Sequence, residues 1–215
     1  QTLEPTQVAG FNQFFDEANA TEAWVYGAGV DQKLSQNIYA GADFFYRDLS
    51  VPVSTVSPTS GTVVDYVDWD EYLGRAYLYY TPHEWLALRA EYGYEKYKYL
   101  DFFNPGAEEV KTHRVPLGVN FFHPSGIFAG LTATYYDQKG DFLNSQTAIY
   151  SNADDTFWLV DAALGYRLPK RYGVITAGVT NLFDNDDFHY WEVDQKNSRI
   201  QPERQAFIKV TLALP

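Results

Sequence analysis

The sequence contains neither cysteine nor methionine. Without cysteine there can be no disulfide bond, no thiolate metal site and no thiol nucleophile. No stretch approaches the roughly 20 consecutive apolar residues of a transmembrane helix. The first residues are polar and lack the basic and then apolar start of a signal peptide, and together with the missing methionine this leads us to expect a processed product or a fragment.

Basic residues are scarce relative to acidic ones. The 16 Lys and Arg are outnumbered by 28 Asp and Glu, which gives a formal net charge of −12. An acidic surface repels phosphates, so we do not expect nucleic acid as a partner.

The common catalytic motifs are missing as well. There is no Gly-x-Ser-x-Gly elbow, P-loop or dinucleotide fingerprint, and the four histidines show no metal-site spacing. For His113, and for His189 near Asp186 and Asp187, we favour a charged loop over a general base held by a carboxylate. We therefore expect no enzyme, no cofactor and no metal site. The acidic clusters are expected to be solvated outer loops without the glycine and distal glutamate of a calcium-binding loop: Asp65, Asp68, Asp70 and Glu71; Asp154 and Asp155; Asp184, Asp186 and Asp187.

Aromatic residues are abundant instead. The chain has 18 Tyr, 15 Phe and 5 Trp, and 46% of its residues are hydrophobic. This composition excludes a disordered tail. A soluble domain rarely needs so many aromatic rings, whereas a membrane barrel places them at both membrane interfaces.

Apolar and polar residues alternate with a period of two along most of the chain. From residue 86 to residue 95, Leu86, Leu88 and Tyr92 fall on one face, and Arg89 and Glu91 fall on the other. A strand separates these sets, whereas a helix would mix them. The same pattern predicts nine strands, within residues 24–31, 38–47, 75–80, 86–95, 114–121, 127–135, 158–167, 175–179 and 205–214.

The connections between these strands alternate in length. We expect tight turns at 34–36, 81–83, 123–126 and 168–171, and long polar loops near 50–64, 100–110, 139–154 and 183–202. Outer-membrane barrels have short periplasmic turns and longer outer loops. On this assignment the last strand runs inward and ends in the periplasm.

We therefore predict an all-β protein, an antiparallel transmembrane β-barrel with about nine or ten strands in this chain. Residues 1–215 are expected to form one barrel segment, with 1–20 as a loop or partial strand and 21–215 as the strand ladder. Residues 8–15 could supply part of a tenth strand. Because bacterial barrels have even strand numbers, we favour a portion of a larger barrel. A soluble β-barrel or sandwich is the alternative.

The polar faces of the predicted strands carry charges that would line the lumen of such a barrel. Opposite charges on neighbouring strands can pair and stiffen the wall, and such a lining also sets which solutes pass. The predicted lumen-lining residues are Asp43, Arg47, Glu71, Arg75, Arg89, Glu91, Glu95, Arg114, Asp161, Arg167 and Lys209.

The last 60 or so residues resemble the C-terminus of TonB-dependent receptors. The resemblance rests on Asn181-Leu182-Phe183-Asp184 after the penultimate strand and on Pro202-x-Arg204 before the last one. It implies a transport barrel in the outer membrane of a Gram-negative bacterium, contacting lipid and lipopolysaccharide, with an upstream plug domain and a TonB-type energy-transducing partner. The chain departs from this family in showing no plug or TonB box and in ending Leu214-Pro215 rather than in an aromatic residue.

A second resemblance covers residues 10–16 and 26–33. These segments are similar to outer-membrane proteins in which tetratricopeptide repeats precede a receptor-like barrel. This resemblance implies secretion of an exopolysaccharide and an upstream helical-repeat domain. Three hypotheses follow: a solute-transport barrel, which we favour, a secretion barrel, and a binding or structural β-sheet module without transport.

Overall fold

The computed structural model describes residues 2–8, 11–17, 20–57, 61–99, 107–144, 149–190 and 203–213. Apart from one short 3-10 turn, η1 (Pro169–Arg171), the regular structure of these residues is β-strand. None of the described residues forms a helix long and apolar enough to cross a membrane. The strands in chain order are β1 (Thr2–Val8), β2 (Phe11–Glu17), β3 (Glu22–Lys33), β4 (Ile38–Ser57), β5 (Gly61–His83), β6 (Leu86–Tyr99), β7 (Ala107–Phe122), β8 (Ile127–Asn144), β9 (Ile149–Arg167), β10 (Gly173–Thr180) and β11 (Gln205–Leu212).

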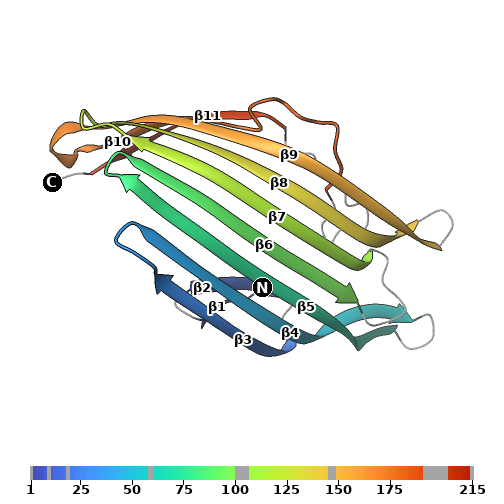
Figure 1. Ribbon diagram of the computed structural model, residues 1–215. Coiled ribbons are helices and arrows are strands. Elements are labelled where there is room, and N and C mark those ends of the chain that lie inside the picture. Colours follow the sequence, from blue (N-terminus) through green and yellow to red (C-terminus); the bar gives the residue numbers. More distant parts are fainter. Residues whose placement is uncertain are drawn as a thin grey trace.

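Strands β3 to β11 form a single nine-stranded sheet. Each strand pairs antiparallel with its neighbours in sequence, so the spatial order is β11-β10-β9-β8-β7-β6-β5-β4-β3 (Figure 1). This result confirms the all-β class and the nine strands expected from the alternation. The sheet is not closed, because β3 and β11 are its two edges. Barrel closure stays a prediction.

The first two strands lie outside this sheet. β1 and β2 pair with each other in a separate two-stranded sheet, with Val8 opposite Phe11. The expectation that residues 8–15 supply part of a tenth strand is therefore wrong for this structure. Two adjacent segments that pair locally need only a short loop to close, and the chain reverses between Val8 and Phe11 instead of running straight on.

Two of the expected long loops are mostly strand. The β4–β5 ladder extends to Ser57 opposite Gly61, and the β8–β9 ladder extends to Asn144 opposite Ile149. Only 58–60 and 145–148 separate the paired strands there. The β-branched residues of these segments favour extended backbone, but their faces do not alternate cleanly, so no strand was expected. The expected turn at 81–83 also belongs to β5, and the chain turns at 84–85 instead.

The strand register divides the side chains into two faces. Directly opposed residues share a face of a sheet. One row of successive register partners crosses the sheet from β3 to β7 and consists of Gly29, Asp43, Arg75, Gly93 and Arg114. We call the face that carries these residues the concave face and the other the outward face.

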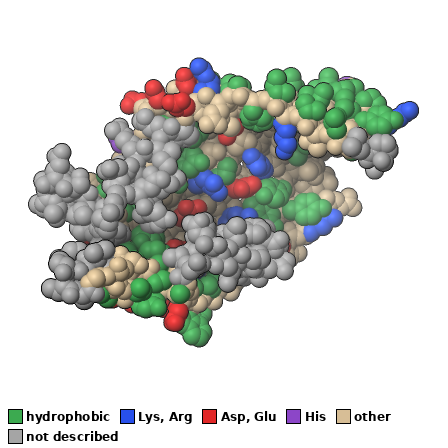
Figure 2. All heavy atoms as spheres, turned by 180° about the vertical axis from the view of Figure 1, so that it is seen from behind, with side chains coloured by type: hydrophobic (Ala, Val, Ile, Leu, Met, Phe, Trp, Pro, Cys, Tyr) green, Lys and Arg blue, Asp and Glu red, His purple; other side chains and the backbone are tan. Residues whose placement is uncertain are grey.

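The charged face of this sheet is the more buried one, and the apolar face is the more exposed one. A sheet in a soluble protein shows the reverse. On the concave face Asp43 and Arg47 are only 7% and 4% exposed, whereas Phe44 between them on the outward face is 48% exposed. Figure 2 shows acidic and basic side chains gathered in the hollow of the molecule, with hydrophobic side chains at its rim. Polar groups are thus sheltered inside the curve, and apolar groups point away from it.

Candidate functional site

All eleven predicted lumen-lining residues lie on the concave face. The register links them strand by strand, and Arg89, Thr132 and Asp161 share this face through the pairs Arg89–Gly118, Gly118–Thr132 and Thr132–Asp161. Lys209 joins the set at the β11 edge through its pairing with Thr176. The period-two pattern therefore assigned every one of these side chains to a common face. That they line a transport path stays a prediction.

The most buried charged groups on the concave face belong to two ion pairs between β4 and β5. Arg75 Nε donates to Asp43 Oδ2 at 3.2 Å, and Arg47 Nη1 donates to Glu71 Oε2. Arg47 and Asp43 are almost fully covered, which makes isolated charges costly. Their carboxylate and guanidinium partners compensate for that cost and tie two neighbouring strands together across the register.

A second polar network crosses the face nearer the turns. Tyr79 Oη donates to Glu91 Oε1 at 3.0 Å, and Arg89 Nη2 donates to Thr132 Oγ1 at 2.9 Å. Arg89 Nη1 also lies 3.9 Å from Glu91. Beside this network, Tyr77 hydrogen-bonds Asp31 and stacks on Tyr79 with 4.7 Å between ring centroids.

Four of the predicted residues are exposed and lie outside these pairs. Among the described residues, Glu95, Arg114, Arg167 and Lys209 have no ion-pair partner on the concave face. Three of these four are cations. Although the eleven residues have mixed signs, the paired charges largely cancel, and the exposed remainder is mostly positive.

The segment after β10 folds along the free edge of β9. Leu182 N donates to Val160 O at 2.7 Å, and Asn185 Nδ2 donates to Trp158 O at 3.2 Å. Phe188 is 1% exposed and stacks on Phe157 with 4.0 Å between centroids. The sequence did not indicate this packing, because the aromatic residues of this acidic loop show no periodic pattern.

The family-motif residues give this segment its shape. Asn181 lies at a positive φ of 47°; its Nδ2 donates to Asn185 O at 2.8 Å, and its Oδ1 accepts from Asn185 N at 2.9 Å. Asn181 N also donates to Asp161 Oδ1 at 2.9 Å. Asp161, one of the predicted lining residues, therefore supports the turn. Asp184 pairs with Arg204 at 3.2 Å. Phe183 is 74% exposed. Pro202 lies outside the described residues.

The described histidines His113 and His189 each contact one neighbouring polar side chain. His189 lies on Asp155, with 2.5 Å from its backbone N to Oδ2 and 3.5 Å from Nδ1, and no nucleophilic side chain is described beside this pair. His113 contacts Tyr92 at 2.8 Å. The described residues contain no group of three or more ligands that could hold a metal ion. Asp65, Asp68, Asp70, Asp154 and Asp155 lie within strands β5 and β9, which corrects their assignment to loops.

Glycines on the concave face stand directly opposite large side chains. A Cβ at Gly41 would lie 2.6 Å from the Tyr77 ring, and a Cβ at Gly118 would lie 2.4 Å from Arg89 Nε. Each of these side chains therefore lies flat over the backbone of the neighbouring strand instead of projecting into the hollow. The same arrangement occurs in the opposed pairs Gly27–Phe45, Gly165–Phe128 and Gly178–Phe207.

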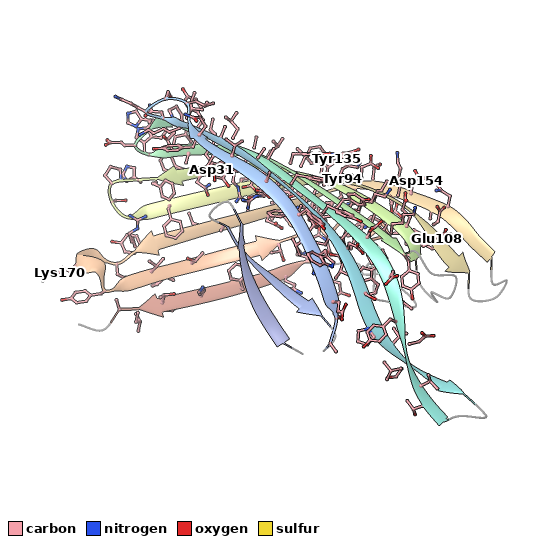
Figure 3. The ribbon with its side chains drawn as sticks, turned by 90° about the horizontal axis from the view of Figure 1, so that it is seen from below. Asp31, Tyr94, Glu108, Tyr135, Asp154 and Lys170 are labelled. Carbon is pink, nitrogen blue, oxygen red and sulfur yellow. The ribbon has the colours of Figure 1, made fainter. Side chains whose placement is uncertain are left out.

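The sheet edges and loop ends can be followed in Figure 3. Lys170 lies at the end where the tight turns are, and Glu108 and Asp154 lie towards the opposite end, with Tyr94 and Tyr135 between them. Comparison with known proteins finds no matching family model, no matching curated protein and no matching solved structure. The sheet and its two contrasting faces therefore carry the argument for function.

Proposed function

We propose that this chain is a wall segment of a transport barrel in the bacterial outer membrane, of the kind found in TonB-dependent receptors. The observation that carries the proposal is the inverted distribution of polarity. Charged residues are concentrated on the concave face, where Asp43, Arg47, Glu71 and Arg75 form ion pairs, while the outward face exposes Trp24 (69%), Leu164 (59%) and Ile208 (78%). Soluble monomers rarely expose so much contiguous apolar surface, whereas lipid stabilises it.

Aromatic rings border the outward apolar surface on the loop side. Tyr26, Tyr46 and Tyr72 are successive register partners, with ring centroids 6.2 Å and 4.9 Å apart. Further along the same outward face, Tyr135 on β8 and Trp158 on β9 are register partners with ring centroids 5.3 Å apart. Amphipathic rings in such a row suit the level where lipid headgroups meet water.

A second aromatic border lies near the tight turns. Trp85 packs edge-on against Phe121 at 5.6 Å, and Tyr166 on the outward face is 38% exposed. Between the two borders the outward residues are mostly Ala, Val and Leu, with Phe44 and Gly74 opposed to each other on β4 and β5. On β5 the stretch from Tyr72 to Tyr80, both on the outward face, is about nine residues long, close to the roughly 9–11 that a tilted strand needs to cross a bilayer.

The proposal is tested by locating the chain in a Gram-negative host that exports it. We expect it to sediment with the outer membrane, to resist extraction by alkaline carbonate and to migrate differently on a gel before and after boiling. A chain that stays folded and monodisperse in buffer without detergent would contradict the proposal. That result would favour the binding or structural module.

Transport itself is tested with the purified protein in planar bilayers. Stepwise conductance that disappears after heat denaturation is expected of a water-filled barrel. Membrane insertion that produces neither conductance nor swelling of solute-loaded vesicles would contradict transport. The chain would then have an anchoring role. Co-purification with a TonB-type protein, compared with a control strain lacking it, tests the energy-transducing partner.

One observation favours secretion of a polysaccharide as the second candidate. Tyr77 and Tyr79 form a stacked pair on the concave face beside Arg75 and Glu91, and Tyr79 is 38% exposed. Aromatic faces next to charged hydrogen-bonding groups suit the apolar and hydroxyl surfaces of sugar rings. Exposing the protein to neutral oligosaccharides and measuring channel block would distinguish the two candidates, with Tyr79→Ala as the variant and Tyr172→Ala, at the turn edge, as its matched control.

A further inference from the structure

Three of the tight turns at one end of the sheet form the walls of a cleft. The chain turns at 84–85, at 123–126 and at 168–172, and a cleft of about 740 Å³ lies between these connections. We call it the turn-end cleft. Lys170, which is labelled in Figure 3, marks this end of the sheet. The charged, polar and aromatic side chains that line the cleft include Glu84, Trp85, His123, Ser125, Arg167 and Lys170.

Backbone hydrogen bonds hold the three turns together. Phe122 N donates to Trp85 O at 2.8 Å, and Arg167 N donates to Gly126 O at 2.8 Å. Gly126 has a positive φ of 98°, and a Cβ at this position would lie 2.7 Å from Arg167 O. Glycine therefore allows the second turn to approach the end of β9 this closely. The walls of the cleft are built into the sheet and do not depend on separate loops.

The charged groups of the cleft are not neutralised by neighbours. Glu84, Arg167 and Lys170 are exposed, and none of them forms an ion pair with a residue that the structure describes. They do not pair with one another either, although all three line the same cleft. Two cations and one carboxylate held in this way suit a ligand that carries charges of both signs.

His123 adds a neutral hydrogen-bond donor. Ser125 N donates to His123 Nδ1 at 3.2 Å, and Ser125 Oγ lies 2.8 Å from the same nitrogen. Because Nδ1 accepts a hydrogen bond from the backbone, the proton of the neutral ring lies on Nε2. Nε2–H has no acceptor among the described residues, so this donor can bind an oxygen of the ligand.

The cleft continues onto the outward apolar surface. Tyr166 lines it, lies on the outward face and is the register partner of both Ile127 and Ile175, which are 46% and 40% exposed. On another wall, Trp85 packs edge-on against the outward residue Phe121 with ring centroids 5.6 Å apart. A ligand held in the cleft can therefore extend an apolar chain over β8, β9 and β10.

We propose that the turn-end cleft binds the zwitterionic headgroup of a membrane phospholipid. The phosphate oxygens accept hydrogen bonds from Arg167, Lys170 and His123 Nε2. The amine of the headgroup pairs with Glu84 beside the ring of Trp85. The acyl chains lie along the outward face. This inference rests on the proposed membrane location, and it assigns a ligand to a cleft that the proposed transport path does not use.

A lipid titration followed by native mass spectrometry tests the site. The purified full chain in detergent micelles is titrated with phosphatidylethanolamine, and we expect one lipid to stay bound per chain. Lys170→Gln should raise the lipid concentration for half occupancy about tenfold, because it removes one charge-assisted hydrogen bond. The matched control is Lys33→Gln, which removes an exposed cation at the same end of the sheet but outside the cleft. It should bind as the unmodified protein does.

A second variant tests the contact with the amine. Phosphatidylglycerol has the phosphate but no amine, so the unmodified protein should bind it about tenfold more weakly than phosphatidylethanolamine. Glu84→Gln should bind the two lipids equally. Inorganic phosphate and free phosphoethanolamine, added at the concentration of the lipid, should not displace it, because they have no acyl chains to contact the outward face.

Several outcomes would overturn the inference. These are the absence of bound lipid, unchanged binding by Lys170→Gln, and an equal loss with Lys33→Gln. Equal binding of both lipids by the unmodified protein would exclude the zwitterionic headgroup, and displacement by phosphoethanolamine or phosphate would show a soluble ligand instead. Carbonate extraction of cells that produce the unmodified chain tests the membrane location separately. A failure of the proposed function is thus distinguished from a failure of this site.

Discussion

Arginine and lysine are distributed unequally between the two faces. Five arginines lie on the concave face, and four lysines, Lys96, Lys98, Lys111 and Lys139, lie on the outward face beyond the aromatic border. The guanidinium group binds carboxylates in a fixed fork and keeps its charge when buried, which suits the ion pairs of the hollow. Lysine reaches water through a flexible apolar stem, which suits a wall next to a headgroup layer. The concave-face arginines are Arg47, Arg75, Arg89, Arg114 and Arg167.

Leu88 and Arg89 are adjacent on β6 but lie on opposite faces. Replacing Leu88 by arginine should therefore be far more destabilising than replacing Arg89 by leucine. Leu88 is 37% exposed on the outward face, whereas Arg89 bonds Thr132 on the concave face. We expect Leu88→Arg to lower the free energy of unfolding in lipid by about 2–4 kcal/mol near the bilayer midplane. Arg89→Leu removes a hydrogen bond and should cost about 1 kcal/mol. Urea titration in lipid vesicles measures both, and a larger loss for Arg89→Leu would mean that the faces are reversed.

At the scale of elements, the sequence predicted the strands wherever one face is apolar. All nine segments were found because the contrast between a polar face and an apolar face imposes a period of two along each strand. Beyond the aromatic border the contrast ends, and the extensions of β4, β5, β8 and β9 could not be recognised. The packing of Phe188 on Phe157 was also out of reach, because it depends on a long-range contact between a loop residue and β9.

The extension of β6 and β7 contains a pH-dependent cluster. Lys96 Nζ lies 3.1 Å from Glu109, and Lys111 also pairs with Glu109. Burial alone would raise the pKa of the Glu109 carboxyl, but hydrogen bonds and charges of Lys111 and Lys96 together lower it. A lowered folded-state pKa contributes stability above the unfolded-state pKa that is lost as the pH falls through the folded-state value.

Glu109→Gln should therefore weaken the acid sensitivity of the protein. We expect it to reduce the free energy of unfolding by about 0.5–1 kcal/mol at neutral pH, since the pair is partly exposed, and to have little effect in strong acid. Urea titrations across the acid range measure this. Glu95→Gln, an exposed carboxyl with no ion-pair partner among the described residues, is the control and should leave the profile unchanged. Equal losses at all pH values would contradict the ion-pair explanation.

The connections at the two ends of the sheet should face opposite sides of the membrane. Ser54 and Asn152 lie near the loop end, and Ser125 lies in the β7–β8 turn. The chain has no native cysteine, so Ser54→Cys, Asn152→Cys and Ser125→Cys are each the single thiol. An impermeant thiol reagent applied to intact cells should label the first two and label Ser125→Cys only after lysis. The reverse pattern would invert the topology.

At the scale of the whole molecule, the ion pairs among the eleven predicted lining residues leave an exposed remainder that is mostly cationic. Of the eleven predicted lining residues, Arg114, Arg167 and Lys209 are exposed without an ion-pair partner among the described residues, against Glu95 alone of opposite sign. Charged linings select permeant ions by sign. A conducting assembly should therefore prefer anions over cations.

Reversal potentials in a salt gradient test that preference. Lys209→Glu should shift the reversal potential towards cation permeation, because the substitution replaces a positive charge on the concave face of β11 with a negative one. Lys170→Glu carries the same change at the turn edge and should have a smaller effect. Identical potentials for the unmodified protein and Lys209→Glu would show that this face does not meet the permeating ion.

The glycines opposite Phe45, Tyr77, Arg89, Phe128 and Phe207 give the wall an unusual profile. Because each large side chain lies over bare backbone, the clear width inside a barrel of the proposed kind would depend on which residues stand beneath these side chains. A single added methyl group at Gly41 would lift the Tyr77 ring from its neighbour and narrow the proposed passage, although the altered residue itself would touch no solute. Permeability in such a protein could thus be tuned over generations from positions hidden under the lining, while the chemistry presented to the passing molecule stays the same.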